Sequence, residues 1–157
     1  MNEMNDIVFG EKLANQAYMN REGAYGIILN DKNEVATVRL PHGYFLPGGG
    51  IEGSENKATC LKRECLEELG WEVEVSQFIG KASSYYYSTY RNLYLYATGY
   101  FYLAKKMQQV TTPIEDDHEL VWMNLETCLN ELHLEHQAWA VKQVKYLLRG
   151  KKVEEIV

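Results

Sequence analysis

Three glutamates, Glu64, Glu67 and Glu68, lie close together on one side of a predicted helix. At ~100° per residue they fall within an arc of roughly 100°, and neighbours three or four positions apart repel by about 0.2–0.5 kcal/mol per pair. Arg63 can reach Glu67 at this spacing, but one guanidinium cannot neutralise three carboxylates. Mg²⁺ and Mn²⁺ prefer oxygen ligands, and either ion bound at this face would offset the repulsion between the three carboxylates. On these residues alone the alternative is a solvated acidic helix face.

The flanking residues set the ends of this helix. Ser54 is the expected N-cap, Glu55 would stand at the positive end of the helix dipole, and Gly70 is the residue type found just past a helix end. These signals predict a helix over residues 55–69. The turn at residues 46–50 precedes it, and its successive glycines allow the backbone to approach a ligand closely. The apolar side chains of the helix form a separate stripe that can pack inward: Ala58, Leu61, Cys65 and Leu69.

The spacing of these residues resembles the Nudix box, the signature of the Nudix hydrolase family. Seven glycine or charged positions match across 23 residues, which at ordinary residue frequencies has a chance well below about one in a million. Two apolar positions hold Cys65 and Trp71, where an aliphatic residue is more usual. The matching positions are Gly49, Glu55, Arg63, Glu64, Glu67, Glu68 and Gly70.

The resemblance implies hydrolysis of a nucleoside diphosphate linked to another moiety, by water that attacks a phosphorus of the pyrophosphate link. Glu64, Glu67, Glu68 and the Gly49 carbonyl are then the expected ligands of Mg²⁺ or Mn²⁺. Such an ion lowers the pKa of the attacking water and neutralises phosphate charge. Arg63 is expected to orient the carboxylates, with little direct contact with the substrate.

A later acidic loop supplies two further candidates. In Nudix enzymes an extra carboxylate from this region often completes the metal site or acts as general base, and Glu115 and Glu119 stand there. We expect Glu115 as a metal ligand and Glu119 as a catalytic residue, although the general base could equally be a glutamate of the box. A solvated acidic loop is the alternative. His118, between them, is expected to be a bystander.

Substrate contacts are predicted at two places. Arg39 ends a predicted strand ten residues before Gly49, where its guanidinium could reach a phosphate; an edge-strand arginine in solvent is the alternative. The tyrosines of residues 85–90, which are expected to lie in a loop, could stack on a nucleobase, and Tyr85 is the candidate, although the spacing does not select one ring. His42, a lone loop histidine, is expected to be solvated.

Length and charge limit the class of protein. At 157 residues the chain is expected to form a single domain, residues 1–157, with residues 1–22 as an N-terminal extension or edge strand. A net charge of −6 argues against a nucleic acid polymer as partner. We expect no membrane span, and no signal peptide is recognisable, so we expect the protein to be cytoplasmic. Cys60, Cys65 and Cys128 are expected to be free thiols.

The order of predicted elements indicates an α/β protein. A hairpin is predicted from residues 24–29 and 35–40, and further strands at residues 72–79, 93–103 and 120–123. Asn124 should cap a short helix, and a last helix should end at Gly150. Strands and helices do not alternate strictly, which favours a mixed sheet with helices on both faces. The Nudix resemblance implies the same α/β/α sandwich.

The sequence does not select one substrate. A MutT-type nucleoside triphosphate pyrophosphohydrolase is favoured because the chain is close to the minimal domain. Dinucleoside polyphosphates and ADP-ribose are alternatives that use the same box. Two other classes are a non-catalytic Nudix-like domain that senses a nucleotide, and an interaction module whose acidic helix binds a basic partner. The oligomeric state stays open.

Overall fold

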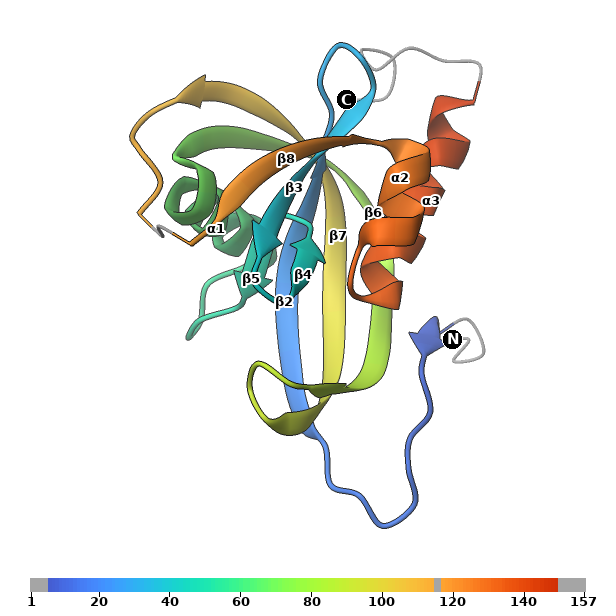
Figure 1. The fold of residues 1–157 in the computed structure, drawn as a ribbon. Coiled ribbons are helices and arrows are strands. Elements are labelled where there is room, and N and C mark those ends of the chain that lie inside the picture. The colour runs from blue at the N-terminus through green and yellow to red at the C-terminus, as the bar shows by residue number, and fades with distance from the viewer. Residues whose placement is uncertain (1–5, 115–116, 150–157) are drawn as a thin grey trace.

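The computed structural model describes residues 6–114 and 117–149, and its described strands form two sheets (Figure 1). The larger sheet has the order β1-β6-β7-β2-β5 and the smaller one β4-β3-β8. Their bounds are β1 Val8–Phe9, β2 Met19–Ile28, β3 Glu34–Leu40, β4 Gly43–Phe45, β5 Gly48–Gly50, β6 Trp71–Ser88, β7 Leu93–Gln109 and β8 Glu119–Asn124. The helices are α1 Lys57–Leu69, α2 Leu125–Glu131 and α3 Glu135–Leu148. Parallel β2–β7 and antiparallel β6–β7 pairs confirm the predicted mixed sheet.

Helices lie on both sides of the larger sheet, with α1 on one side and α2 and α3 on the other (Figure 1). Successive side chains of β7 point to opposite faces of the sheet, and each face is covered by its own layer of helices. Phe101 is fully buried and contacts His136 and Trp139 of α3, whereas Tyr102 on the opposite face packs against the core under α1. The α/β/α arrangement expected from the sequence is therefore confirmed.

The two ends of α1 differ in how well the sequence predicted them. Gly70 has the left-handed φ of 71° expected of a residue just past a helix end. The start was predicted two residues too early, at Glu55. The N-cap is Asn56, whose side chain accepts a hydrogen bond from the Thr59 amide, so Ser54 is not the cap.

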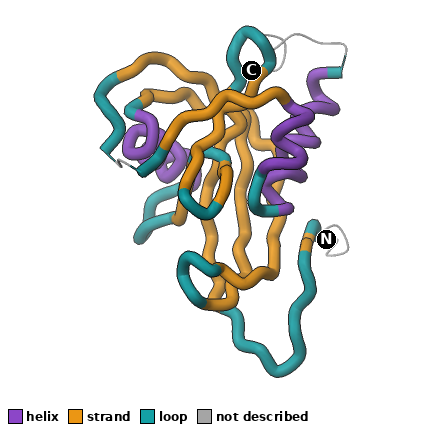
Figure 2. The backbone as a smooth tube through the Cα atoms, viewed as in Figure 1, coloured by secondary structure: helices purple, strands orange, loops and turns teal. Residues whose placement is uncertain are grey.

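Two strand predictions are wrong in a way that matters for the site. The expected hairpin of β2 and β3 is reduced to one bridge, Leu29 to Val35, because β3 pairs with β4 and β8 in the other sheet. The tyrosines at residues 85–87 lie in β6 and not in a loop, since β6 and β7 pair as far as Ser88 and Leu93. Figure 2 shows the long loop between β1 and β2 passing around the far end of this sheet.

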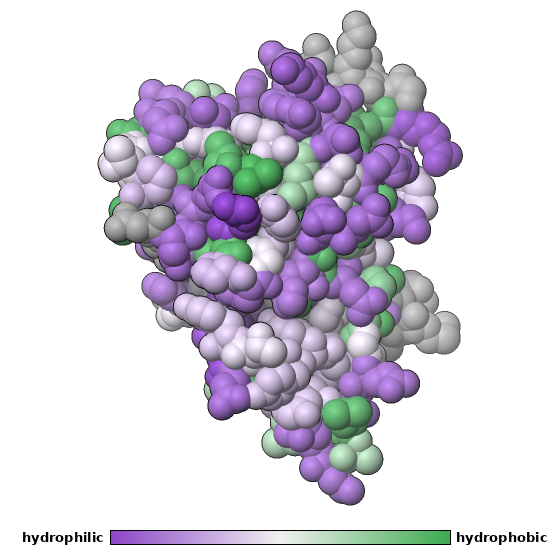
Figure 3. All heavy atoms as spheres, viewed as in Figure 1, coloured by the Kyte–Doolittle hydropathy of each residue, from purple (hydrophilic) through white to green (hydrophobic). Residues whose placement is uncertain are grey.

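The remaining expectations concern the termini and the surface. Val8–Phe9 pairs with β6 as a short edge strand, and Asn124 caps α2 as predicted. Gly150, the predicted end of α3, lies outside the described residues. Within residues 6–114 and 117–149, no helix is both long and apolar enough to cross a bilayer. The face drawn in Figure 3 is largely polar, with apolar side chains in small separate groups.

Candidate active site

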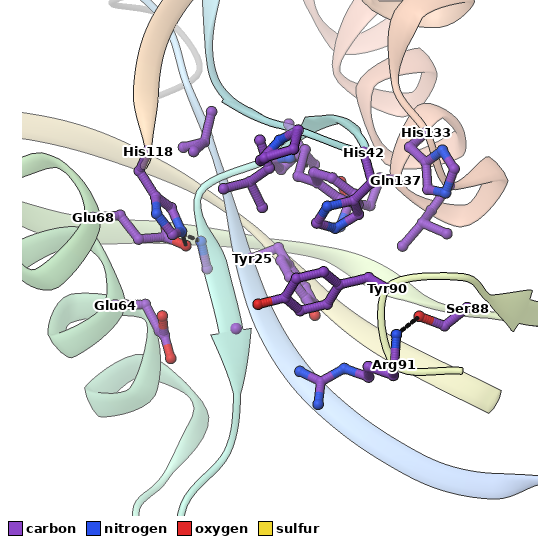
Figure 4. A pocket seen from close by; sticks show the side chains of 18 of the residues that line it. Tyr25, His42, Glu64, Glu68, Ser88, Tyr90, Arg91, His118, His133 and Gln137 are labelled. Carbon is purple, nitrogen blue, oxygen red and sulfur yellow. Dashed lines mark hydrogen bonds and ion pairs between the residues drawn. The ribbon is translucent and has the colours of Figure 1, made fainter. Parts of the chain in front are cut away.

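A cavity of about 290 Å³ lies between the glycine turn, α1 and the turn that joins β6 to β7. Glu64 and Glu68 reach one side of it from α1, beside Gly48 and Gly49 of β5 (Figure 4). The glycine turn and the acidic helix predicted from the sequence therefore meet at one place. Glu67, in contrast, is not among the residues that line the cavity.

Glu68 is a buried carboxylate held by the glycine turn. Its Oε1 accepts a hydrogen bond from the Gly48 amide at 3.0 Å, and the residue is 7% exposed. Gly48 has a φ of 142°, and a Cβ there would lie 2.2 Å from the Ala24 carbonyl oxygen, so only glycine fits. On the other side, His118 Nε2 lies 3.5 Å from Glu68 Oε2. His118 was expected to be a bystander, yet it stands beside a candidate catalytic carboxylate.

Glu64 occupies the space that a side chain at Gly49 would need. A Cβ on Gly49 would lie 2.5 Å from Glu64 Cδ and 2.6 Å from its Oε2. The carboxylate thus packs directly on the backbone of the turn, which brings carboxylate and carbonyl oxygens into one neighbourhood. The Gly49 carbonyl also lies 3.4 Å from the Cys60 thiol, which is buried under the turn. Burial raises the pKa of Cys60 to about 11, so this thiol stays protonated.

Arg63 connects the acidic side chains of the box. Its guanidinium donates to both oxygens of Glu55, at 2.7 and 3.1 Å, and to the Gly50 carbonyl at 3.1 Å. Nη1 donates to Glu64 at 3.0 Å and to Glu67 at 3.2 Å. The hydrogen bonds from Arg63 lower the pKa of Glu55 to about 2. Arg63 therefore contacts the carboxylates of Glu55, Glu64 and Glu67 at the same time.

The donor chemistry of this region suits a hard divalent cation. Glu64 and Glu68 offer carboxylate oxygens at one wall of the cavity, which Gly49 also lines, and Mg²⁺ needs few protein ligands because it keeps several waters. Among the described residues, no three His, Cys, Asp or Glu side chains already converge on one point. Glu67 would join these ligands if its side chain turned away from Arg63. The Glu67 side chain is 35% exposed, so its ion pair with Arg63 is weak.

Three other predicted residues lie elsewhere. Arg39 forms an ion pair with Glu119 at 2.6 Å, and the two line a second, adjoining cavity instead of the one beside the glycine turn. Both side chains are more than half exposed. Tyr85 packs edge-on against Tyr18 and does not line the main cavity. Glu115 lies outside the described residues.

Two arginines that the sequence analysis did not select line the main cavity. Arg21 comes from β2, and its guanidinium lies close to Gly50, where a Cβ would be 3.2 Å away. Arg91 comes from the β6–β7 turn, where its amide donates to Ser88 Oγ at 3.0 Å (Figure 4). Both stand alone in the sequence without a motif, so only the pairing of distant strands brings them to the glutamates. They are suited to bind phosphate oxygens.

Tyr25 lies between these groups in the wall of the cavity (Figure 4). Burial raises the pKa of its phenol to about 12, so this residue is a neutral hydrogen-bonding group at physiological pH. The charged groups of the cavity then include Glu64 and Glu68 on the α1 side, Asp117 from the loop before β8, and the two arginines. This arrangement can hold a cation and a polyphosphate together.

Comparison with known proteins agrees with this geometry. A NUDIX domain model matches residues 19–147. A NUDIX hydrolase from Nitrosomonas europaea superposes with a TM-score of 0.66 at 13% identity, covering 85% of this chain and 91% of that one. A MutT protein from Methanosarcina mazei Go1 gives 0.64 at 20% identity, covering 86% and 98%. A MutT NUDIX hydrolase from Burkholderia pseudomallei gives 0.60 at 23% identity, covering 80% and 98%.

At these identities the structural likeness concerns the fold. A search of curated proteins found no match to this chain. The domain model, however, spans most of the chain and includes the whole box from Gly49 to Trp71. The chain therefore belongs to the Nudix family of hydrolases, which act on phosphoric anhydride bonds of nucleoside diphosphate derivatives and generally use divalent metal ions.

Proposed function

We propose that this protein uses Mg²⁺, or Mn²⁺ in its place, to hydrolyse the pyrophosphate link of a nucleoside diphosphate derivative. The observation that carries the proposal is the meeting of Glu64, Glu68 and the glycine turn on one wall of a cavity that also contains Arg21 and Arg91. Carboxylates without cations would repel a polyphosphate, and arginines without carboxylates would only bind it. Their combination supports metal-assisted hydrolysis.

Each residue has a proposed role in this reaction. Glu64, Glu68 and the Gly49 carbonyl would hold the cation, and Glu67 would complete the set once it turns from Arg63. A cation held there would lower the pKa of a bound water and neutralise phosphate charge. Arg63 fixes the direction of the carboxylates through its hydrogen bonds.

The two arginines of the cavity and the acidic loop complete the proposal. Arg21 and Arg91 hold the phosphate oxygens in line with the attacking water. Glu119 is paired with Arg39 outside the main cavity, which favours a glutamate of the box as the general base. Glu115 stays a candidate ligand from its place in the sequence.

Among substrates we favour nucleoside triphosphates, with dinucleoside polyphosphates and ADP-ribose as alternatives. The similarity to two proteins described as MutT supports this order, although at 20% and 23% identity it is a likeness of fold. We also propose that residues 1–157 act as a single domain, since the described helices and strands all pack around the two sheets.

A substrate panel with purified protein tests the function. Nucleoside triphosphates, an oxidised deoxynucleoside triphosphate, a dinucleoside tetraphosphate and ADP-ribose are incubated with and without Mg²⁺, and the products are separated by ion-exchange chromatography. We expect a mononucleotide product that requires the metal. Nucleotide binding without turnover of any substrate, with Mg²⁺ or Mn²⁺, would support the non-catalytic sensor and overturn the proposal.

A pair of matched variants tests the proposed residues. Glu64→Gln keeps the size of the side chain but removes its charge, and should lower kcat by about 100-fold or more. Glu126→Gln on α2 makes the same change on an exposed side chain outside the cavity and should leave kcat unchanged. Equal activity of the two variants would exclude Glu64 from the mechanism.

A further inference from the structure

The wall of the cavity away from the glutamates is built from aromatic rings. His42, Phe45, Tyr90 and His133 line it, and His42 stacks on Tyr90 with ring centroids 4.5 Å apart and an angle of 9° between the planes. Phe45 contacts both histidines, at 5.0 Å from His42 and 5.4 Å from His133. We call these four rings the ring wall. Figure 4 shows its labelled members opposite Glu64 and Glu68.

The two stacked rings come from different loops. His42 lies between β3 and β4, and Tyr90 lies in the turn between β6 and β7. Tyr90 is 67% exposed although it stacks on His42 with one face. Its other face is therefore open to a second planar group. A planar ring fixed by stacking on one face and exposed on the other is a suitable platform for a base.

Polar groups with spare hydrogen-bonding capacity accompany the rings. His42 Nδ1 is buried and has no hydrogen-bond partner among the described residues. Gln137 of α3 is also buried, and its Oε1 accepts from the Leu46 amide at 2.8 Å. That bond fixes the orientation of the amide and leaves its NH₂ group as a donor at the wall of the cavity.

The charges along the cavity follow an order. Burial lowers the pKa of His42, so its ring is neutral at physiological pH. In Figure 4 Arg91 lies below Tyr90, with its guanidinium turned toward the side of the cavity that holds Glu64. Glu64 and Glu68 form the other end. The cavity thus offers a neutral aromatic group with a cation beside it and an oxygen-ligand site, which matches the base, the phosphates and the metal of a nucleotide.

We propose that the ring wall binds the nucleobase of the substrate, which stacks on the open face of Tyr90 and presents its polar edge to Gln137 and His42. This inference deepens the proposed function and rests on it for the identity of the ligand. It makes the base a recognised part of the substrate. A sugar diphosphate without a base would use only the arginine and metal end of the cavity.

Binding of mononucleotides without metal tests the proposal separately from catalysis. Adenosine, guanosine, cytidine and uridine 5′-monophosphates are compared with ribose 5-phosphate by isothermal titration calorimetry. At least one nucleotide should bind roughly 5- to 150-fold more tightly than ribose 5-phosphate, the range that base–aromatic stacking provides. Equal binding of all five compounds would overturn the proposal, whatever the protein hydrolyses.

Three variants identify the ring responsible. Tyr90→Leu should abolish the preference for the base and raise KM for nucleotide substrates by the same factor, while kcat stays within about threefold. Tyr90→Phe keeps the ring and should keep the preference for the base. Tyr146→Leu removes a half-exposed tyrosine of α3 outside the cavity and serves as the matched control.

The outcomes separate the two proposals. A base preference that depends on Tyr90 in a protein without hydrolytic activity would keep the ring wall and reject the proposed function. Hydrolysis of nucleotides with an unchanged KM in Tyr90→Leu would keep the function and reject the ring wall.

Discussion

Gly49→Ala separates the chemistry of the site from the stability of the fold. The added Cβ would lie 2.5 Å from Glu64 Cδ and 2.6 Å from Glu64 Oε2. Carbon atoms in contact normally stay about 3.5–4.0 Å apart, so the carboxylate must retreat by roughly 1 Å or more. The backbone of Gly49 does not have a positive φ, so alanine is not strained there. The obstacle is the end of a flexible side chain, which can move.

The expected effect is a large loss of activity in a stable protein. A displacement of about 1 Å in a catalytic group costs about 100-fold in rate, which corresponds to roughly 2.7 kcal/mol of transition-state stabilisation. The free energy of unfolding should change by less than about 1 kcal/mol, since replacing glycine also restricts the unfolded chain. The assay is kcat/KM with Mg²⁺ on the best substrate of the panel, together with urea unfolding.

Gly53→Ala is the matched control in the same loop. Gly53 has a φ of 55°, and a Cβ there would have no atom within 4 Å. This variant should lose about 1–2 kcal/mol of stability and keep its activity, the reverse of Gly49→Ala. If Gly49→Ala retained kcat/KM within threefold of the wild type, the position of Glu64 against the turn would have no role in catalysis.

Three further predictions concern stability. Arg63→Met should lower the free energy of unfolding by about 2–4 kcal/mol, because the box carboxylates lose their shared cation, and Mg²⁺ should restore part of it in a urea titration; no recovery with Mg²⁺ would count against a cation site. Burial lowers the pKa of His136 to about 4, below the 6.5 of the unfolded chain, so its contribution is complete above pH 6.5 and is lost between pH 6.5 and 4. That loss amounts to about 3 kcal/mol, and His136→Gln should flatten the stability profile over this range. Gly70→Ala combines a φ of 71° with a Cβ 2.0 Å from the Thr111 carbonyl oxygen, so thermal unfolding should show a loss larger than the ~1–2 kcal/mol of the φ alone.

The predictions from sequence were most accurate for features that depend on residues close together in the chain. The glycine turn, the helix after it and its end at Gly70 depend on residues within about two dozen positions, and the structure brings them together as expected. The start of α1 was missed because Ser54 and Asn56 are both residue types that favour the N-cap position. Asn56 takes that place, and Glu55 turns to Arg63 instead of the helix terminus.

What the sequence could not predict depends on pairing between distant strands. The tyrosines at residues 85–87 were placed in a loop because their strand is long only through its partner β7, as in the pair Tyr85–Tyr96. Tyr86 and Tyr90 line the cavity and Tyr85 does not, a choice made by the alternation of β6 and by the turn that follows. His42 reaches the same wall from another sheet.

The arginines show the same limit. Arg39 lay close to the box in sequence, but in the structure Glu119 of β8 pairs with it outside the main cavity. Arg21 is much farther from the box in sequence, and the pairing of β2 with β5 carries it to the glycine turn. Separation along the chain was therefore a poor guide to which arginine lines the main cavity.

Titration with Mn²⁺, followed by the electron paramagnetic resonance signal of the free ion, tests whether the carboxylates of α1 bind a divalent cation. We expect the wild type to bind Mn²⁺ and the double variant Glu64→Gln, Glu68→Gln, with an unchanged circular dichroism spectrum, to bind it at least about tenfold more weakly. Glu126→Gln should bind as the wild type does. Equal Mn²⁺ affinity in all three proteins would contradict the claim that the carboxylates facing the glycine turn hold the catalytic cation.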